Sequence, residues 1–223
     1  AQAEGETFED GVRLAVEAML VSPHFLFRIE RDRRPEDPEA LRYLNDFELA
    51  SRLSYFLWSS MPDEELFALA RDGQLRNEAV LARQVERMIG DEKAWAFVEN
   101  FTGQWLHLRN LRYTGRNREL FPTFSRSLRD AMKQESELFF DTVLREDLSV
   151  LSFLDSDFTF ANEELAKHYG IEGVEGKEMQ RVSLEPGGQR GGVLTHASVL
   201  TLTSYSRRTS PVLRGAWVLE NIL

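Results

Sequence analysis

The sequence contains no cysteine among its 223 residues. Disulfides, thiolate metal sites and covalent haem attachment are therefore excluded within these residues. The sequence also lacks any apolar run near the roughly 18 residues that a membrane-spanning helix needs, so we expect no membrane span. Basic residues are too few to balance the acidic ones: 27 Lys and Arg against 37 Asp and Glu give a net charge of −10. This balance argues against nucleic acid or an anionic membrane as a partner, because both require a basic face.

The first six residues are acidic and contain no apolar segment, so they predict no signal peptide. A helical pattern begins at Thr7, and residues 211–223 predict a helix with no stop signal after it. We therefore expect the chain to be a fragment of a larger protein. Its composition, 42% hydrophobic and 29% charged, is typical of a globular domain.

Helical periodicity dominates the chain. From Thr7 onward, apolar residues such as Phe8, Val12 and Met19 recur with the 3.6-residue period and predict a helix with one buried stripe. Capping and stop residues predict the ends of several further helices. These signals are Asn45 with Glu48, Asp63, Gly73, Gly90, Asp91, Ser125 before a long helix over 126–145, Asn162 with Gly170, and Ser210 with Pro211.

Residues 173–192 differ from the rest because they are rich in glycine. An extended stretch over 179–184 and a turn at Pro186 indicate an irregular or β-hairpin insertion. We therefore predict an all-α, or mainly α, multi-helix domain with this one insertion. Two sub-units are expected, an N-terminal helical one over 1–120 and a second over 121–223 with the long helix, sharing one core.

Six segments together resemble a known group of proteins. They are Val21-Ser22-Pro23-His24-Phe25-Leu26-Phe27-Arg28, residues 48–63 (ELASRLSYFLWSSMPD), Asn100-Phe101-Thr102-Gly103-Gln104-Trp105-Leu106, Thr159-Phe160-Ala161-Asn162-Glu163, His168-Tyr169-Gly170-Ile171, and Arg208-Thr209-Ser210-Pro211-Val212-Leu213-Arg214-Gly215. With these segments in this order, nearly the whole chain resembles consecutive domains of unknown function in planctomycete-type, cytochrome-c-associated multidomain proteins of bacteria.

The resemblance implies a periplasmic or secreted protein with a c-type haem in a neighbouring domain of the same polypeptide. It therefore implies an adjacent cytochrome c-type domain as the partner and no cofactor within this chain itself. The resemblance carries over no catalytic residues, so catalytic residues stay unknown, and no metal site is predicted.

Residues 203–211 form the segment whose side chains most strongly suggest a binding site. Hydroxyl side chains and two adjacent arginines precede a helix that Ser210 caps, and the free N–H groups of a helix start attract anions. We consider the following residues candidates for binding an anion, such as a haem propionate or a substrate carboxylate: Ser204, Ser206, Arg207, Arg208, Thr209, Ser210 and Arg214. The alternative is structural: the arginines pair with acidic neighbours and Ser210 only caps its helix.

The four histidines, His24, His107, His168 and His196, lie far apart in the sequence, so no pair has metal-ligand spacing. His168, in the last turn of a predicted helix, and His196, near the start of another, are candidate haem ligands if the fold brings them to a partner domain. A structural role is the alternative for both.

Glu135 stands within the apolar stripe of the long predicted helix. Because a lone buried charge is costly, we expect a buried salt bridge from Glu135 to an arginine.

Two functions remain open from the sequence. The first is a non-catalytic helical module that packs against a c-type cytochrome domain in an extracytoplasmic redox protein. The second is the catalytic domain of a haem-linked oxidoreductase or hydrolase, with its site near residues 203–214. A deep pocket that gathers Arg207, Arg208, His196 and an acidic residue would favour the second function, and a packed interior would favour the first.

Overall fold

The computed structural model describes residues 7–27, 30, 34–37, 39, 41–185 and 187–223. The chain divides into two compact units: residues 1–55 with 60–84, and residues 56–59 with 85–223. The sequence analysis predicts two sub-units that meet near residue 120 and share one core. The structure groups residues 85–120 with the C-terminal unit because this stretch packs on the long helix and on the last elements of the chain.

In the first unit, all regular secondary structure of the described residues is helical. Its helices are α1 (Phe8–Leu20), α2 (Pro23–Leu26), most of α3 (Asp46–Trp58), α4 (Glu64–Arg71) and the start of α5 (Glu78–Gly90). Predicted signals act at their ends: Asn45 and Glu48 exchange hydrogen bonds as a capping box, and the Asp63 side chain accepts from the backbone of Leu66. Gly73 follows α4 with a φ of 66°, a conformation that glycine adopts without a steric penalty.

The stripe predicted to be buried on α1 is exposed in the structure. The side chains of Phe8 and Met19 are 71% and 64% exposed, and none of the residues of α1 is buried. The helix itself is confirmed, with Thr7 and Asp10 forming a capping box at its start. The expected burial is wrong because α1 packs on α2, which is too short to cover an apolar stripe of this length.

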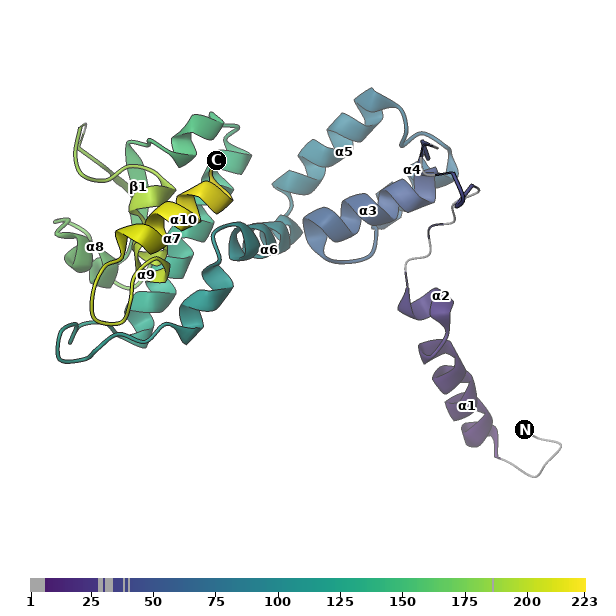
Figure 1. Ribbon diagram of the computed structural model, residues 1–223. Coiled ribbons are helices and arrows are strands. Elements are labelled where there is room, and N and C mark those ends of the chain that lie inside the picture. Colours follow the sequence, from purple (N-terminus) through teal and green to yellow (C-terminus); the bar gives the residue numbers. More distant parts are fainter. Residues whose placement is uncertain (1–6, 28–29, 31–33, 38, 40, 186) are drawn as a thin grey trace. The chain divides into compact units, whose positions relative to one another are not determined.

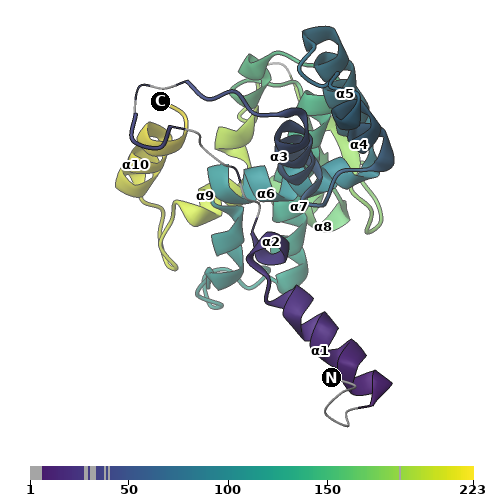
Figure 2. The ribbon, with the colours of Figure 1, turned by 90° about the vertical axis from the view of Figure 1, so that its right-hand side faces the viewer.

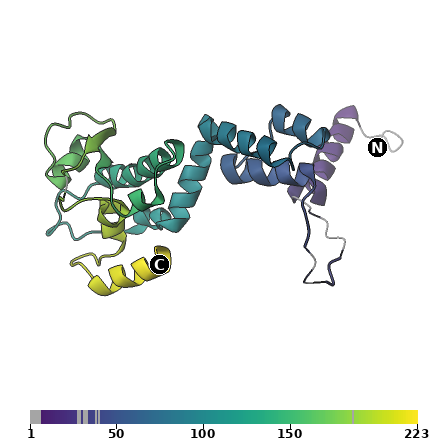
Figure 3. The same ribbon diagram turned by 90° about the horizontal axis from the view of Figure 1, so that it is seen from above.

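The second unit is built on the long helix α7 (Arg126–Arg145), which Ser125 caps as predicted. Around it the chain forms 3₁₀ segments η2 (Glu92–Ala94), η3 (Leu108–Tyr113), η4 (Val150–Phe153) and η5 (Val193–Thr195), helices α6 (Trp95–Trp105), α8 (Glu163–Tyr169), α9 (Ala197–Leu202) and α10 (Pro211–Asn221), and strands β1 (Phe158–Ala161) and β2 (Gln180–Ser183). Figures 1 and 2 both show α9 beside α7, and Figure 3 shows α10, in yellow, at the edge of this unit.

The mainly α fold class is confirmed, with one small antiparallel sheet in the described residues. Strand β2 lies in the segment predicted to be extended, but its partner is β1, which precedes α8. Phe158 pairs with Ser183 and Ala161 with Gln180, so α8 lies between the two strands in the sequence, and only β2 falls within residues 173–192.

Two apolar clusters fill the second unit. Both draw on α7. One joins Leu106, Leu108, Phe139, Val143, Phe158, Val193, Val199 and Trp217; the other joins Leu111, Leu128, Ala131, Met132, Ala161, Leu165, Ala166 and Ala197. Burial of such side chains is the main favourable term in folding, so these clusters fix how α7, β1, α8 and α9 lie together.

Candidate functional site

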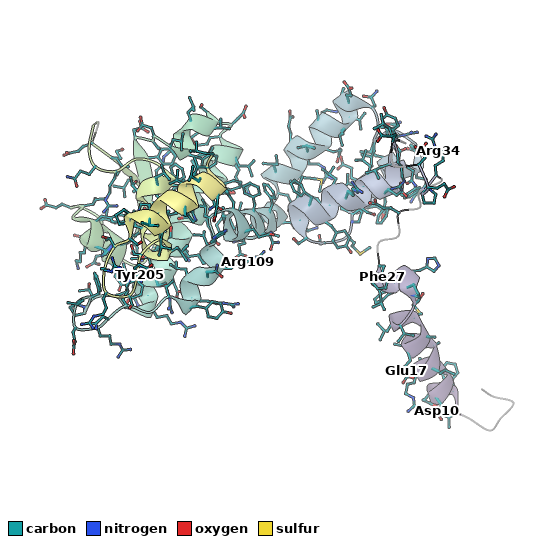
Figure 4. All side chains as sticks on the ribbon, in the orientation of Figure 1. Asp10, Glu17, Phe27, Arg34, Arg109 and Tyr205 are labelled. Atoms are coloured by element: carbon teal, nitrogen blue, oxygen red, sulfur yellow. The ribbon has the colours of Figure 1, made fainter. Side chains whose placement is uncertain are left out.

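The loop between α9 and α10 carries most of the residues predicted to bind an anion. Its ends are tied by a bridge between Ser204 and Thr209, and Tyr205 marks the loop in Figure 4. Ser210 caps α10 as predicted, with its hydroxyl 3.3 Å from the backbone nitrogen of Leu213. The hydroxyl of Ser204 donates instead to the backbone oxygen of Leu200, at 2.7 Å, while Ser206 and Thr209 are exposed.

Arg207 and Arg208 both lie on the surface of this loop. The guanidinium of Arg208 lies 5.0 Å from the ring centre of Tyr205, a cation–π distance. In the described part of the chain, neither arginine forms an ion pair with a carboxylate. The acidic neighbours that the structural alternative requires are therefore not among these residues.

Arg214 lies in a different environment from Arg207 and Arg208. Its side chain is half-buried, and its Nε atom lies 3.4 Å from the hydroxyl of Thr203. Arg214 lines a cleft of about 880 Å³ together with Arg190, whereas Arg207 and Arg208 are not part of that lining. The predicted group of anion-binding residues thus divides between an exposed loop and a cleft.

His196 lies inside the core at the start of α9, with a relative exposure of 2%. Its Nδ1 atom is 3.0 Å from the hydroxyl of Ser136, which in turn lies 2.7 Å from the hydroxyl of Ser198. Phe139 packs edge-on against the ring, and no group of the described residues forms a hydrogen bond with Nε2. Burial, helped by the positive charge of Arg190, lowers the pKa of His196 to about 3, so the ring is neutral at physiological pH.

His168 occupies the last turn of α8, as the sequence predicts, and is exposed. Its ring lies 5.8 Å from that of Tyr169, centre to centre. The two candidate haem ligands therefore differ in access: His168 is presented at the surface, while the free nitrogen of His196 is enclosed.

Glu135 is buried on α7, but the predicted salt bridge to an arginine is wrong. Its two carboxyl oxygens accept hydrogen bonds from the hydroxyls of Thr159, at 2.7 Å, and Tyr169. No ion pair to Glu135 exists among the residues described in the structure; Arg190 acts on it only at longer range. Desolvation outweighs these favourable interactions and raises the pKa of Glu135 to about 7, so the carboxyl group needs no permanent counter-charge.

Tyr169 connects this carboxyl group to its surroundings. Its hydroxyl accepts from the backbone nitrogen of Ala197 at 2.7 Å while donating to Glu135, and burial raises its own pKa. The guanidinium of Arg190 lies 3.5 Å from the ring centre of Tyr169 and donates to the backbone oxygen of Thr195 at 3.1 Å. Tyr169 and Arg190 therefore stand between Glu135 and the cleft that both residues line.

The glycine-rich segment positions Arg190 by running against the backbone of η4. Gly192 has a φ of 65°, and a Cβ atom there would lie 2.4 Å from the backbone oxygen of Phe153. Only glycine fits so close an approach. Behind Arg190, a small space lined by Glu135, Thr195 and His196 has no room for a water molecule. The space around these residues is therefore closely packed, and the open cleft lies outside it.

Sequence reasoning identified Glu135, His196 and Arg214 but missed Tyr169 and Arg190. The only sequence signal for Arg190 was its place in a glycine-rich segment, which has no phosphate-binding pattern. The described residues include no group of three or more His, Asp or Glu side chains that could hold a metal ion. Among them, no helix is both long and apolar enough to cross a bilayer.

These features define a mainly α-helical module with a packed polar centre, a surface cleft and an exposed arginine loop. The family model PSD4, described as a protein of unknown function (DUF1592), matches residues 44–171, more than half of the chain. The chain belongs to this family. Residues 1–30 match PSD5 (DUF1595), and residues 190–223 match PSCyt3 (DUF1588), both also of unknown function. No curated protein and no solved structure matches the chain. The predicted resemblance to cytochrome-c-associated domains of unknown function is confirmed.

Proposed function

We propose that this chain is a non-catalytic helical module that packs against a c-type cytochrome domain in an extracytoplasmic redox protein. The loop formed by residues 203–210 and the first turn of α10 would receive an anionic group of that domain, such as a haem propionate. The observation that carries the proposal is the outward placement of Arg207 and Arg208, which form no ion pair with a carboxylate of the described chain.

Electrostatics support this role. The chain has a net charge of −10, so two adjacent exposed guanidiniums form a small positively charged area on an otherwise acidic chain. The N-terminus of α10 adds backbone N–H groups and a positive dipole end beside them. A guanidinium can bind a carboxylate through two parallel hydrogen bonds, which favours a propionate over a neutral group.

The family match gives a second line of support. The PSCyt3 model covers residues 190–223 and therefore includes both the loop and α10. Its name associates this part of the chain with cytochromes.

The alternative, a catalytic domain with its site near residues 203–214, has weaker support. Glu135, which accepts a hydrogen bond from Tyr169, lines one small space together with His196, but that space admits no water. The two exposed arginines do not line the cleft beside them. Arg207 and Arg208 line neither this cleft nor the small space beside His196, so the alternative has less support than the non-catalytic role.

The test measures binding of this chain to a purified c-type cytochrome domain by titration calorimetry at low and high salt. We expect the double variant Arg207→Ala/Arg208→Ala to weaken binding by about tenfold to a hundredfold, from the loss of charged hydrogen bonds. The double variant Arg71→Ala/Arg83→Ala changes the net charge equally in the first unit and is the matched control. Unchanged affinity of the loop variant, or an equal loss in both variants, would contradict the proposal.

A further inference from the structure

The cleft beside Tyr169 has the size and composition of a binding site for a small molecule. Its volume of about 880 Å³ falls in the range of ligand pockets, roughly 300–1,000 Å³. Part of the lining comes from the end of α8 and the residues after it, 169–172, and the rest from residues 183–185, 188–190, Leu194, Thr195, Leu200 and Arg214. The first part lies at the end of the PSD4 match, and Arg190 and Arg214 lie in the PSCyt3 match, so the cleft requires both family segments.

Two guanidiniums give the cleft its charge. Arg190 stacks on Tyr169 and uses one N–H group for the backbone oxygen of Thr195, so its remaining donors are held in a fixed plane. Arg214 is anchored through Nε to Thr203, which leaves its terminal N–H groups without a hydrogen bond within the described chain. Neither guanidinium forms an ion pair with a described carboxylate; Glu172 and Glu185 line the cleft as exposed residues.

The walls between these charges include apolar side chains. Ile171, Leu184, Leu194 and Leu200 are half-buried and line the same cleft. Pockets of this kind bind a ligand through apolar contacts and fix its orientation through a few polar groups. An acid with an apolar body satisfies both features, because its carboxylate suits a guanidinium and its body suits the leucines.

We propose that this cleft binds a small organic carboxylate with an apolar body, held by Arg190 and Arg214 against the leucine-lined wall. The site adjoins the surface proposed to contact a cytochrome at Arg214, in the first turn of α10, but Arg207 and Arg208 do not line it.

Three probes of graded chemistry test the proposal in calorimetric or NMR titrations of the full chain. Phenylacetate carries both the charge and the apolar body, phenylacetamide keeps the body without the charge, and acetate keeps the charge with almost no body. We expect phenylacetate to bind at least about tenfold more tightly than either of the others, because each lacks one of the two contributions. Equal binding of phenylacetamide, or no binding of phenylacetate at millimolar concentration, would overturn the proposal.

Variants locate the binding. Arg214→Gln should weaken phenylacetate binding about tenfold, the loss of one charged hydrogen-bond partner. Arg190→Lys keeps the charge but loses the planar fork and the stacking on Tyr169, so a smaller loss of several-fold is expected. Circular dichroism checks that each variant is folded, and Arg83→Gln in the first unit is the charge-matched control. Unaltered affinity in Arg214→Gln, or an equal loss in Arg83→Gln, would exclude the cleft as the site.

The cytochrome titration and the phenylacetate titration are run on all of these variants. Loss of cytochrome binding in Arg207→Ala/Arg208→Ala with phenylacetate binding retained would support two separate sites. Loss of phenylacetate binding in that loop variant would place the anion on the loop and overturn the assignment to the cleft.

Discussion

Helices α1 and α7 have similar sequence signals, but α1 is exposed and α7 is largely buried. Each has a capped N-terminus and an apolar stripe with helical spacing. Nevertheless α1 buries none of its residues, whereas α7 buries nine, among them Phe139 and Glu135. The difference shows that a stripe predicts a helix, while burial depends on whether other elements of the chain cover it.

The covering elements of α7 come from distant parts of the sequence. Strand β1, helix α9 and helix α6 all pack on it, and two hydroxyls from β1 and α8 satisfy Glu135. Two residues further along α7, and on another face of it, Glu137 is also buried but pairs with Lys133 at 2.9 Å. A covered helix can therefore bury polar groups, provided that a covering element or the helix itself supplies their partners.

The largest expected effect contrasts one phenylalanine from each of these stripes. Phe139→Ala should reduce the free energy of unfolding by about 3–5 kcal/mol, because it leaves a cavity in the core of the second unit. Phe8→Ala, on the exposed stripe of α1, should change it by less than about 0.5 kcal/mol. Urea unfolding measures both values. A comparable loss in Phe8→Ala would show that the stripe of α1 is covered in the isolated chain. It would contradict the difference in burial between α1 and α7.

The next effect concerns the segment that covers α7 near Arg190. Gly192→Ala should cost about 3–4 kcal/mol, because its Cβ would collide with the backbone of η4 and its φ is positive. Gly173→Ala is the control, since its φ is also positive but nothing lies within 4 Å of its Cβ. It should cost only about 1 kcal/mol. Equal losses in thermal unfolding would mean that the close approach at η4 does not constrain the segment.

The pH dependence of stability tests the polar group in the stripe of α7. Because the pKa of Glu135 is raised from 4.5 to about 7, the folded chain retains a proton that the unfolded chain releases. This group's contribution to stability is full below pH 4.5 and is lost as the pH rises through about 7. Glu135→Gln removes that loss, so its stability relative to the unmodified chain should rise by roughly 3 kcal/mol over this window.

Denaturant unfolding at a series of pH values makes the measurement. The lowered pKa of His196 acts in the opposite direction, since its contribution is present above pH 6.5 and is lost as the pH falls toward 3. That contribution is common to both chains and cancels in the difference between them. Parallel pH curves for Glu135→Gln and the unmodified chain would contradict the raised pKa.

Much of the fold was predictable because its signals are local. Ser125, Asn162 and Ser210 each cap the helix that the sequence assigns to them, through hydrogen bonds across three residues. The extended segment around residues 179–184 is likewise confirmed as β2. Strand β1 was missed because its pairing with β2 is not local: α8 lies between the two strands in the sequence.

The candidate site was only partly predictable. The arginine loop and its helix cap are where the sequence places them, and Glu135 is buried as its position in the stripe indicates. The hydroxyl partners of Glu135 are 24 and 34 residues away, and no local pattern relates them. Arg190 carried no motif at all, so its stacking on Tyr169 could not be inferred.

The sequence by itself determined the helical class, most helix ends, the acidic balance and the family resemblance. These depend on composition and on interactions within a turn or two of the chain. The tertiary structure alone decided which apolar stripe is covered, that His196 is enclosed, and that Arg214 joins Arg190 in a cleft apart from Arg207 and Arg208. Those outcomes depend on contacts between residues far apart in the sequence, whose pairing is set by the packing of whole elements and not by any local pattern.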